Sequence, residues 1–169
     1  DNTGFSILDL GDISRRTTSL DALVEYHNMY FILLGGLEPE RVATGVVSWD
    51  YFQALGVTPF LGRTFRAEDD RHEAEATLVL SHEYWQRAFA ASPAAIGQTL
   101  MFNGAAREVV GVLPEDFRFL RANPLVIAPQ KIDRATIHAA GFNYQGIARL
   151  KPGVTIEQAN ADVARLLPS

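Results

Sequence analysis

The sequence predicts an α+β fold, in which short helices alternate with hairpins of a mixed or mostly antiparallel sheet. Asn103-Gly104 lies between two β-prone runs, and this dipeptide is the strongest short-range signal for a two-residue hairpin turn. Thr155 and Gln158 form a capping-box pattern ahead of apolar residues at helical spacing. Hairpins and short helices thus interleave along the chain, an order more typical of α+β folds than of a wound parallel sheet.

The first part of the chain predicts a short entry segment followed by a hairpin. Residues 1–11 mix glycine and asparagine with isolated apolar residues, so we expect an irregular or helical entry. Ser19 is a candidate helix cap or turn residue. Residues 26–34 are aromatic and β-prone and residues 41–48 alternate, so strands on either side of Gly35-Gly36 are expected.

Residues 46–65 supply many large apolar side chains within one short segment. Ser48 is placed to cap a helix, Asp50 suits its first turn, and Gly56 suits its end. We therefore expect a structural hub, meaning a packing centre, built from this segment and later residues. The residues assigned to this hub are Tyr51, Phe52, Leu55, Gly56, Pro59, Gly62, Phe65, Trp85, Phe89, Gly104, Gly111, Pro114 and Phe117.

In the middle of the chain, the most charged run is followed by a predicted buried strand and then by a predicted helix. Residues 66–75 predict a solvated loop, and they are the best candidate for a boundary between two subdomains. Residues 76–80 form a compact apolar run, which indicates a buried strand. Ser81 is expected to cap the following helix, with Glu83 in its first turn and Trp85 on its apolar face.

The last part of the chain predicts strands and a closing helix. Residues 98–102 and 107–113 are the arms of the Asn-Gly hairpin, and shorter strands are expected at 125–128 and 142–150. The helix that follows the capping box has its apolar residues at helical spacing: Ile156, Ala159, Val163 and Leu166.

The composition limits the classes of protein to which the chain can belong. A chain of 169 residues with 47% hydrophobic and 21% charged residues fits one domain, or two small subdomains, with a sizeable core. Its net charge of -5 argues against nucleic acid and against adhesion to an anionic membrane surface. The absence of cysteine excludes disulfides, thiol catalysis and cysteine metal sites. No apolar run approaches the roughly 18 residues that span a bilayer, and no signal peptide is visible. We therefore expect either a cytosolic protein or an excised piece of a larger one.

No residue pattern points to catalysis. His72 and His82, with neighbouring acids, can be imagined as a zinc cluster, but no histidine pair has the spacing of a helical metal site. Ser81 precedes His82 without the G-x-S-x-G elbow of a serine hydrolase. Gly35-Gly36 is followed by neither the lysine nor the glycine pattern of a phosphate loop. We therefore assign no catalytic, cofactor-binding or metal-binding residue.

Five sequence blocks, in this order and spacing, carry a resemblance to a known family. They are W-D-Y-F-Q-A-L-G-V-T-P-F-L-G-R-T-F-R-A-E-D-D (49–70), V-L-S-H-E-Y-W-Q-R-A-F (79–89), I-G-Q-T-L-M-F-N-G (96–104), V-V-G-V-L-P-E-D-F-R-F (109–119) and R-L-K-P-G-V-T-I-E-Q-A (149–159). Together they resemble the MacB-like periplasmic core domain of MacB/FtsX-type ABC-transporter permeases. The resemblance covers about residues 14–167.

The resemblance implies a place and a role for the chain. Such domains lie on the periplasmic side of the membrane, between the first and second transmembrane helices of a permease, and they are not enzymes. Their partners are the transmembrane part of the same permease, a cytoplasmic ATPase subunit or domain, and in some members a periplasmic adaptor protein. The fold combines a porter-like βαβ part with a second, smaller subdomain. By itself, the fragment is expected to be monomeric.

The leading hypothesis is therefore a non-catalytic extracytoplasmic domain, residues 1–169, that couples ATP-driven motion to substrate export or partner engagement. It predicts that the fragment does not bind ATP, because a phosphate loop is absent from the sequence. The alternatives are a small metal-assisted hydrolase that uses His72 and His82, and a stand-alone ligand-binding module.

Overall fold

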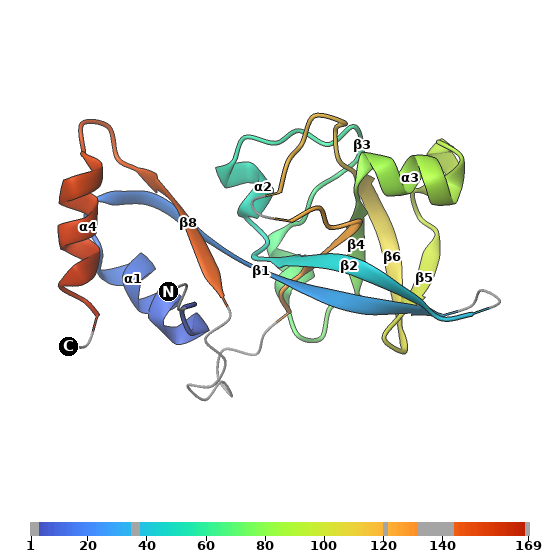
Figure 1. Cartoon of the computed structure of the whole chain (residues 1–169), viewed down its shortest axis with the longest axis horizontal. Helices are drawn as coiled ribbons and strands as arrows, with labels where there is room; N and C mark the ends of the chain where they lie inside the picture. The colour runs from blue at the N-terminus through green and yellow to red at the C-terminus, as the bar shows by residue number, and fades with distance from the viewer. Residues whose placement is uncertain (1–3, 35–37, 120–121, 132–143, 168–169) are drawn as a thin grey trace. The chain divides into compact units, whose positions relative to one another are not determined.

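The chain divides into two compact units. The computed structural model describes residues 4–34, 38–119, 122–131 and 144–167. Unit 1 comprises Asp1–His27 and Asp133–Ser169, and unit 2 comprises Asn28–Ile132 (Figure 1). Unit 2 is thus one continuous stretch inserted between the two segments of unit 1. The expected boundary at 66–75 is not where the chain divides, because these residues lie inside unit 2.

Unit 1 packs two helices with two paired strands. Its elements are α1 (Ile7–Arg16), the first part of β1 (Leu20–Leu34), β8 (Gln145–Leu150) and α4 (Ile156–Ala164). β1 and β8 pair antiparallel, from Leu20 opposite Leu150 to Tyr26 opposite Gln145. α4 begins with the predicted capping box: the Gln158 amide donates to Thr155 Oγ1 at 3.2 Å.

The segment before β1 confirms the helical alternative for the entry and excludes the helix-cap role considered for Ser19. The entry is a full helix that runs to Arg16, and Ser6 and Asp9 form a second capping box at its start. Ser19 caps no helix, because β1 begins directly after it. The Ser19 hydroxyl instead donates to Asp162 Oδ2 in α4 at 2.8 Å, and the Thr18 amide donates to the same oxygen at 2.8 Å. These bonds tie the start of β1 to α4.

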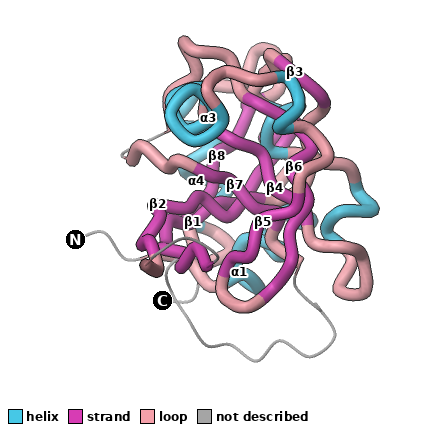
Figure 2. Tube along the Cα trace, turned by 90° about the vertical axis from the view of Figure 1, so that its right-hand side faces the viewer, coloured by secondary structure: helices cyan, strands magenta, loops and turns pink. Residues whose placement is uncertain are grey.

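Unit 2 is built around a mixed sheet, as the sequence predicts. Its strands are β2 (Glu40–Val47), β7 (Val126–Pro129), β4 (Thr77–Leu80), β6 (Ala105–Val112), β5 (Thr99–Phe102) and the second part of β1, in this spatial order. The β2–β7 and β4–β6 pairs are parallel, whereas β4–β7, β5–β6 and β1–β5 are antiparallel. β2 also pairs with β1, so the strand order returns to its start (Figure 2), and the short β3 (Leu61–Gly62) pairs with β6.

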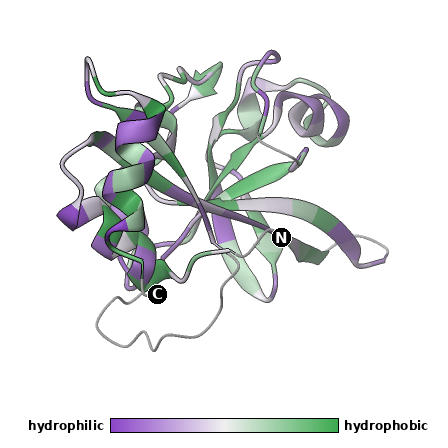
Figure 3. Ribbon diagram, turned by 60° about the vertical axis from the view of Figure 1, so that its left-hand side comes forward, coloured by the Kyte–Doolittle hydropathy of each residue, from purple (hydrophilic) through white to green (hydrophobic). Residues whose placement is uncertain are grey.

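The Asn-Gly hairpin and the buried strand are confirmed. Asn103 and Gly104 both have positive φ, 50° and 75°, as a two-residue turn between β5 and β6 requires. Every residue of β4 is buried. The core of unit 2 contains Phe31, Leu78 and Phe102, and Figure 3 shows the strands of this unit with mostly hydrophobic residues. The first hairpin's Gly35-Gly36 lies outside the described residues.

Among the short helices of unit 2, the predicted N-cap is confirmed for α3 and is wrong for α2. The helices are α2 (Tyr51–Ala54), η1 (Ala67–Asp70), α3 (His82–Phe89) and η2 (Pro93–Ala95). The Tyr84 amide donates to Ser81 Oγ at 3.1 Å, which confirms the predicted cap of α3. The prediction for Ser48 is wrong, because Asp50 is the N-cap of α2 and Ser48 accepts the Tyr51 amide through its backbone carbonyl.

Residues 66–75 are not a loose, solvated loop along their whole length. Asp69 within η1 is buried, and Arg63 donates to its two carboxylate oxygens at 2.6 and 3.1 Å. The Arg66 amide donates to Oδ2 at 2.7 Å. Burial by itself raises the pKa of Asp69, but the hydrogen bonds from Arg63 and Arg66 outweigh it and lower the pKa. A buried carboxylate needs such partners, and they anchor this run to unit 2.

Candidate functional site

An aromatic cluster packs around α2 in unit 2. Phe52 lies at its centre, with ring centroids 5.4 Å from Tyr51, 5.9 Å from Phe65 and 5.7 Å from Phe117. Phe119 stacks on Tyr51 at 5.5 Å. Tyr51, Phe52 and Phe65 are fully buried, which is what a packing centre requires.

The residues assigned to the hub do not all join this cluster. Trp85 and Phe89 pack instead with the core of the sheet, where the Trp85 indole nitrogen donates to the Ser92 carbonyl at 2.8 Å. Leu55 is 40% exposed, so its assignment to the buried hub is corrected. α2 ends at Ala54, and Leu55 therefore does not extend its buried face.

The glycines and prolines assigned to the hub have distinct local roles. A Cβ atom on Gly111 would lie 2.0 Å from the Arg63 carbonyl oxygen, and one on Gly62 would lie 2.2 Å from the Val110 carbonyl oxygen. Gly56 has a φ of +68° with open space around it. Of the prolines, Pro59 and Pro114 are half-buried, and Pro114 borders the cavity described next.

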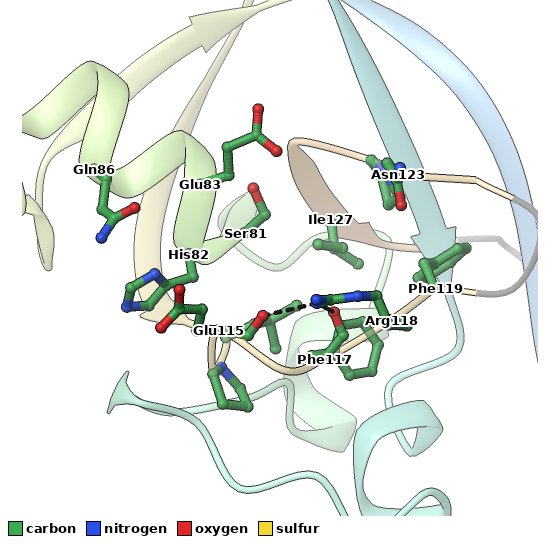
Figure 4. Close-up of a pocket in the computed structure, with 13 residues that line it drawn as sticks. Ser81, His82, Glu83, Gln86, Glu115, Phe117, Arg118, Phe119, Asn123 and Ile127 are labelled. Carbon is green, nitrogen blue, oxygen red and sulfur yellow. Dashed lines mark hydrogen bonds between the residues drawn. The ribbon is translucent and has the colours of Figure 1, made fainter.

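A cavity of about 420 Å³ opens beside the aromatic cluster, between the start of α3, the loop after β6 and the segment before β7 (Figure 4). Its floor is apolar, and its buried members are Leu113, Phe119, Pro124 and Ile127. Its polar lining residues are Ser81, His82, Glu83, Gln86, Glu115, Arg118 and Asn123. An apolar floor with a few polar groups around it is the usual construction of a ligand site, and the volume is in the range of such sites.

Arg118 fixes the loop that borders the cavity. Its Nη1 donates to the carbonyl oxygens of Glu115 at 2.7 Å and Phe117 at 2.9 Å. Figure 4 shows the guanidinium extending across the cavity toward Glu115. The same loop continues into Phe119, whose ring packs on Tyr51. The aromatic cluster thus supports the cavity floor, and Arg118 holds the turn above it.

The start of α3 forms another side of the cavity. Ser81 Oγ is used by the Tyr84 amide, whereas the amides of His82 and Glu83 have no hydrogen-bond partner in the part of the chain that the structure describes. The His82 ring lies edge-on to Trp85, with centroids 5.2 Å apart, and near Phe60 at 5.2 Å. This end of the helix therefore offers backbone donors and the positive end of its dipole.

Charges of both signs line the cavity. Glu83 and Glu115 are carboxylates and Arg118 is a guanidinium. Within residues 4–34, 38–119, 122–131 and 144–167, none of these three takes part in an ion pair.

The metal-assisted hydrolase receives no support from the geometry. Among the described residues, no group of three or more histidine, aspartate or glutamate side chains is placed to hold a metal ion. His82 contacts aromatic rings, and His72 is exposed on the segment after η1. His72 and His82, singled out from the sequence, do not form a metal site with their neighbouring acids.

Unit 1 contains a second hollow of about 400 Å³, lined mostly by apolar side chains of α1, β1, β8 and α4. Gly146 and Ala148 contribute small residues to it, and Ile156 at its border is 66% exposed.

Among the described residues, no helix combines the length and the apolar character needed to cross a membrane.

Sequence reasoning missed the cavity. It assigned Ser81 and Glu83 to helix capping, and it gave no role to Arg118, Asn123 or Gln86. The only available signal was the block P-E-D-F-R-F after a β-prone run. That block does not reveal that the arginine folds back on two carbonyls of its own loop.

Comparison with known proteins decides the family. The model of the family described as "MacB-like periplasmic core domain" matches residues 2–166. The chain belongs to this family. The resemblance noted in the sequence is thus confirmed, and the match extends over nearly the whole chain. No protein with a curated description matches the chain.

Solved structures share the fold of this MacB-like core domain. The periplasmic region of MacB from Actinobacillus actinomycetemcomitans has a TM-score of 0.73 at 19% identity, over 97% of this chain and 73% of that one. The extracellular domain of the ABC-type transporter YknZ from Gram-positive bacteria has a TM-score of 0.72 at 16% identity, over 99% and 84%. A domain of a putative permease protein from Porphyromonas gingivalis has 0.67 at 15% identity, over 97% and 69%. The α+β fold predicted from the sequence is confirmed.

Proposed function

We propose that this MacB-like core domain is the extracytoplasmic domain of an ABC-transporter permease and acts without catalysis. It couples the ATP-driven motion of a cytoplasmic ATPase subunit or domain to substrate export or to engagement of a partner, such as a periplasmic adaptor. The observation that carries this proposal is the family match over residues 2–166. The fold shared with periplasmic and extracellular transporter domains supports it.

The arrangement of unit 1 suits a domain inserted between two membrane helices. Both ends of the described chain run into unit 1, through α1 at one end and α4 at the other (Figure 1). Asp162 of α4 accepts hydrogen bonds from the amides of Thr18 and Ser19 at the start of β1, at 2.8 and 3.0 Å. A displacement of either chain end therefore reaches unit 1 first, and β1 continues from there into unit 2.

Cysteine labelling of the parent permease tests the location. The domain has no cysteine, so a single introduced thiol gives an unambiguous signal. Glu73 is exposed and Val79 is fully buried, and both lie in unit 2. In a parent chain otherwise free of cysteine, Glu73→Cys is expected to react with a membrane-impermeant maleimide added to intact cells or, for a periplasmic site, to cells with a permeabilised outer membrane.

The matched control is Val79→Cys, which is expected to react only after denaturation, because its side chain is buried in β4. If Glu73→Cys stays unlabelled until the cytoplasmic membrane itself is broken, the domain lies on the cytoplasmic side and the proposal fails.

A further inference from the structure

The hydrogen bonds of Arg118 leave one edge of its guanidinium open. Nη1 carries two hydrogens, and the Glu115 and Phe117 carbonyls accept from it at 2.7 and 2.9 Å. Nε and Nη2 have no hydrogen-bond partner among the residues that the structure describes. These two nitrogens form the side of the guanidinium that can hold a carboxylate through two parallel N–H···O bonds. Arg118 is thus held in place and still has a carboxylate-binding edge.

The start of α3 lies on the same cavity and favours the same charge. The amides of His82 and Glu83 have no partner in the described residues, and both residues line the cavity together with Arg118. Backbone N–H groups at a helix start stabilise an anion, and the helix dipole adds to this. Two separate elements therefore offer donors for one anionic group.

The two glutamates limit the charge of the ligand. Glu83 and Glu115 line the cavity and form no ion pair among the described residues. A phosphate or a ligand with several carboxylates would place more negative charge beside them, and like charges at short range are unfavourable. The lining thus disfavours ligands that carry more than one negative charge.

The floor of the cavity adds an apolar requirement. Phe119 and Ile127 are buried and line the floor, and the aromatic cluster behind Phe119 keeps it in place. An apolar group that enters the cavity loses contact with water, which favours its binding. A volume of about 420 Å³ accommodates an amino-acid side chain together with adjoining backbone.

We propose that this cavity binds the C-terminus of a peptide or protein, with the terminal carboxylate on Arg118 and the α3 amides and an apolar last side chain on the floor. Gln86 and Asn123 at the border can hydrogen-bond to the peptide groups before the terminus. The inference rests on the cavity of unit 2 and does not depend on the proposed membrane location.

The test uses the 169-residue chain and the tetrapeptide acetyl-Gly-Ser-Gly-Leu with a free carboxyl terminus. In ¹H–¹⁵N NMR titrations, the free acid is expected to shift the amide signals of His82, Glu83 and Phe119. The same peptide with an amidated C-terminus is expected to bind at least about tenfold more weakly, because the charge-assisted pair is lost. Equal binding of both peptides overturns the proposal.

Matched variants assign the effect to the cavity. Arg118→Gln is expected to weaken binding at least about tenfold. Arg71→Gln, an exposed arginine elsewhere in unit 2, leaves binding unchanged. Since Arg118 also holds its own loop, Asn123→Trp serves as an independent variant: it fills the mouth of the cavity while the Arg118 bonds remain, and it is expected to abolish the peptide shifts. Shifts that persist in Asn123→Trp, or that map to unit 1, overturn the proposal.

The source of the carboxylate is distinguished with N-acetyl-leucine, which has the same carboxylate and side chain but lacks the preceding peptide. The tetrapeptide is expected to bind more tightly. Equal affinity for both would show a small-molecule carboxylate site and overturn the peptide assignment, without bearing on the proposed role of the domain in a permease.

Discussion

Two glycines with different backbone geometry show how single residues constrain this domain. Gly111 in β6 faces Gly62 of β3, and a Cβ atom at Gly111 would lie 2.0 Å from the Arg63 carbonyl oxygen. Its φ lies outside the left-handed region, so the constraint there is space. Gly56 is the opposite case, with φ of +68° and no atom within 4 Å of the position that a Cβ atom would take. The same residue type is thus required for steric reasons at one position and for conformational reasons at the other.

Gly111→Ala is expected to lower the free energy of unfolding by at least about 2 kcal/mol, because the strand pair must separate to admit the methyl group. Gly56→Ala is expected to cost about 1 kcal/mol, the penalty for an alanine in the left-handed region. Urea denaturation of both variants measures the difference. A smaller loss for Gly111→Ala than for Gly56→Ala would show that β3 and β6 separate easily.

At the scale of an element, α2 acts as a support for aromatic packing. It has only four residues and no side-chain cap, so its own hydrogen bonds stabilise it weakly. Tyr51 and Phe52 are 1% and 0% exposed, and they bring together the rings of Phe65, Phe117 and Phe119. Tertiary contacts of these two side chains therefore stabilise the helix.

Phe52→Ala is expected to lower the free energy of unfolding by about 3–5 kcal/mol, since it leaves a cavity at the centre of the aromatic cluster. Leu55→Ala, at the end of the same helix, is expected to cost less than about 1 kcal/mol, because Leu55 is exposed. Thermal and urea unfolding compare the two variants. Similar losses in both would mean that α2 is stabilised by its local sequence and not by the cluster.

At the scale of the whole molecule, each unit contains an aspartate that links two segments and whose pKa is lowered by hydrogen bonds. In unit 1, Asp162 accepts from the Ser19 hydroxyl, from Arg165 and from the Thr18 and Ser19 amides, and these donors lower its pKa well below the ordinary value of 3.8. In unit 2, burial of Asp69 is outweighed by Arg63 and Arg66, and its pKa is also lowered. Asp162 joins α4 to the residues just before β1, and Asp69 joins η1 to Arg63 and Arg66.

The domain is therefore expected to lose stability in acid. Because the folded pKa values lie below the unfolded value of 3.8, the stabilisation is complete above about pH 4 and is lost as the pH falls further. Urea midpoints at about pH 7 and about pH 3 measure this loss. Asp162→Asn and Asp69→Asn should each lower the midpoint at neutral pH and flatten its pH dependence, whereas Glu73→Gln, at an exposed position, should keep the dependence of the parent. An unchanged slope in both Asp variants would contradict the assignment.

The local signals in the sequence were read correctly where neighbouring residues supply the whole interaction. Ser81 bonds to an amide three residues away, Thr155 and Gln158 bond to each other, and Asn103-Gly104 takes the positive φ angles of its turn, to which Ile32 of β1 adds two hydrogen bonds with Asn103. Ser48 is the exception. The N-cap of α2 lies two residues later than the cap pattern suggests, and the helix begins with the buried side chains of Tyr51 and Phe52. Family membership was likewise available from five ordered blocks.

The sequence by itself thus determined the alternation of hairpins and helices, the mixed sheet and the family. The tertiary structure decided the strand order, the division into two units, the contact of Ser19 with Asp162 across 143 residues, and the cavity around Arg118. The reason is physical: turns and caps are stabilised by atoms within a few residues, whereas a cavity and a strand order depend on which distant segments pack together, and local propensity does not encode that choice.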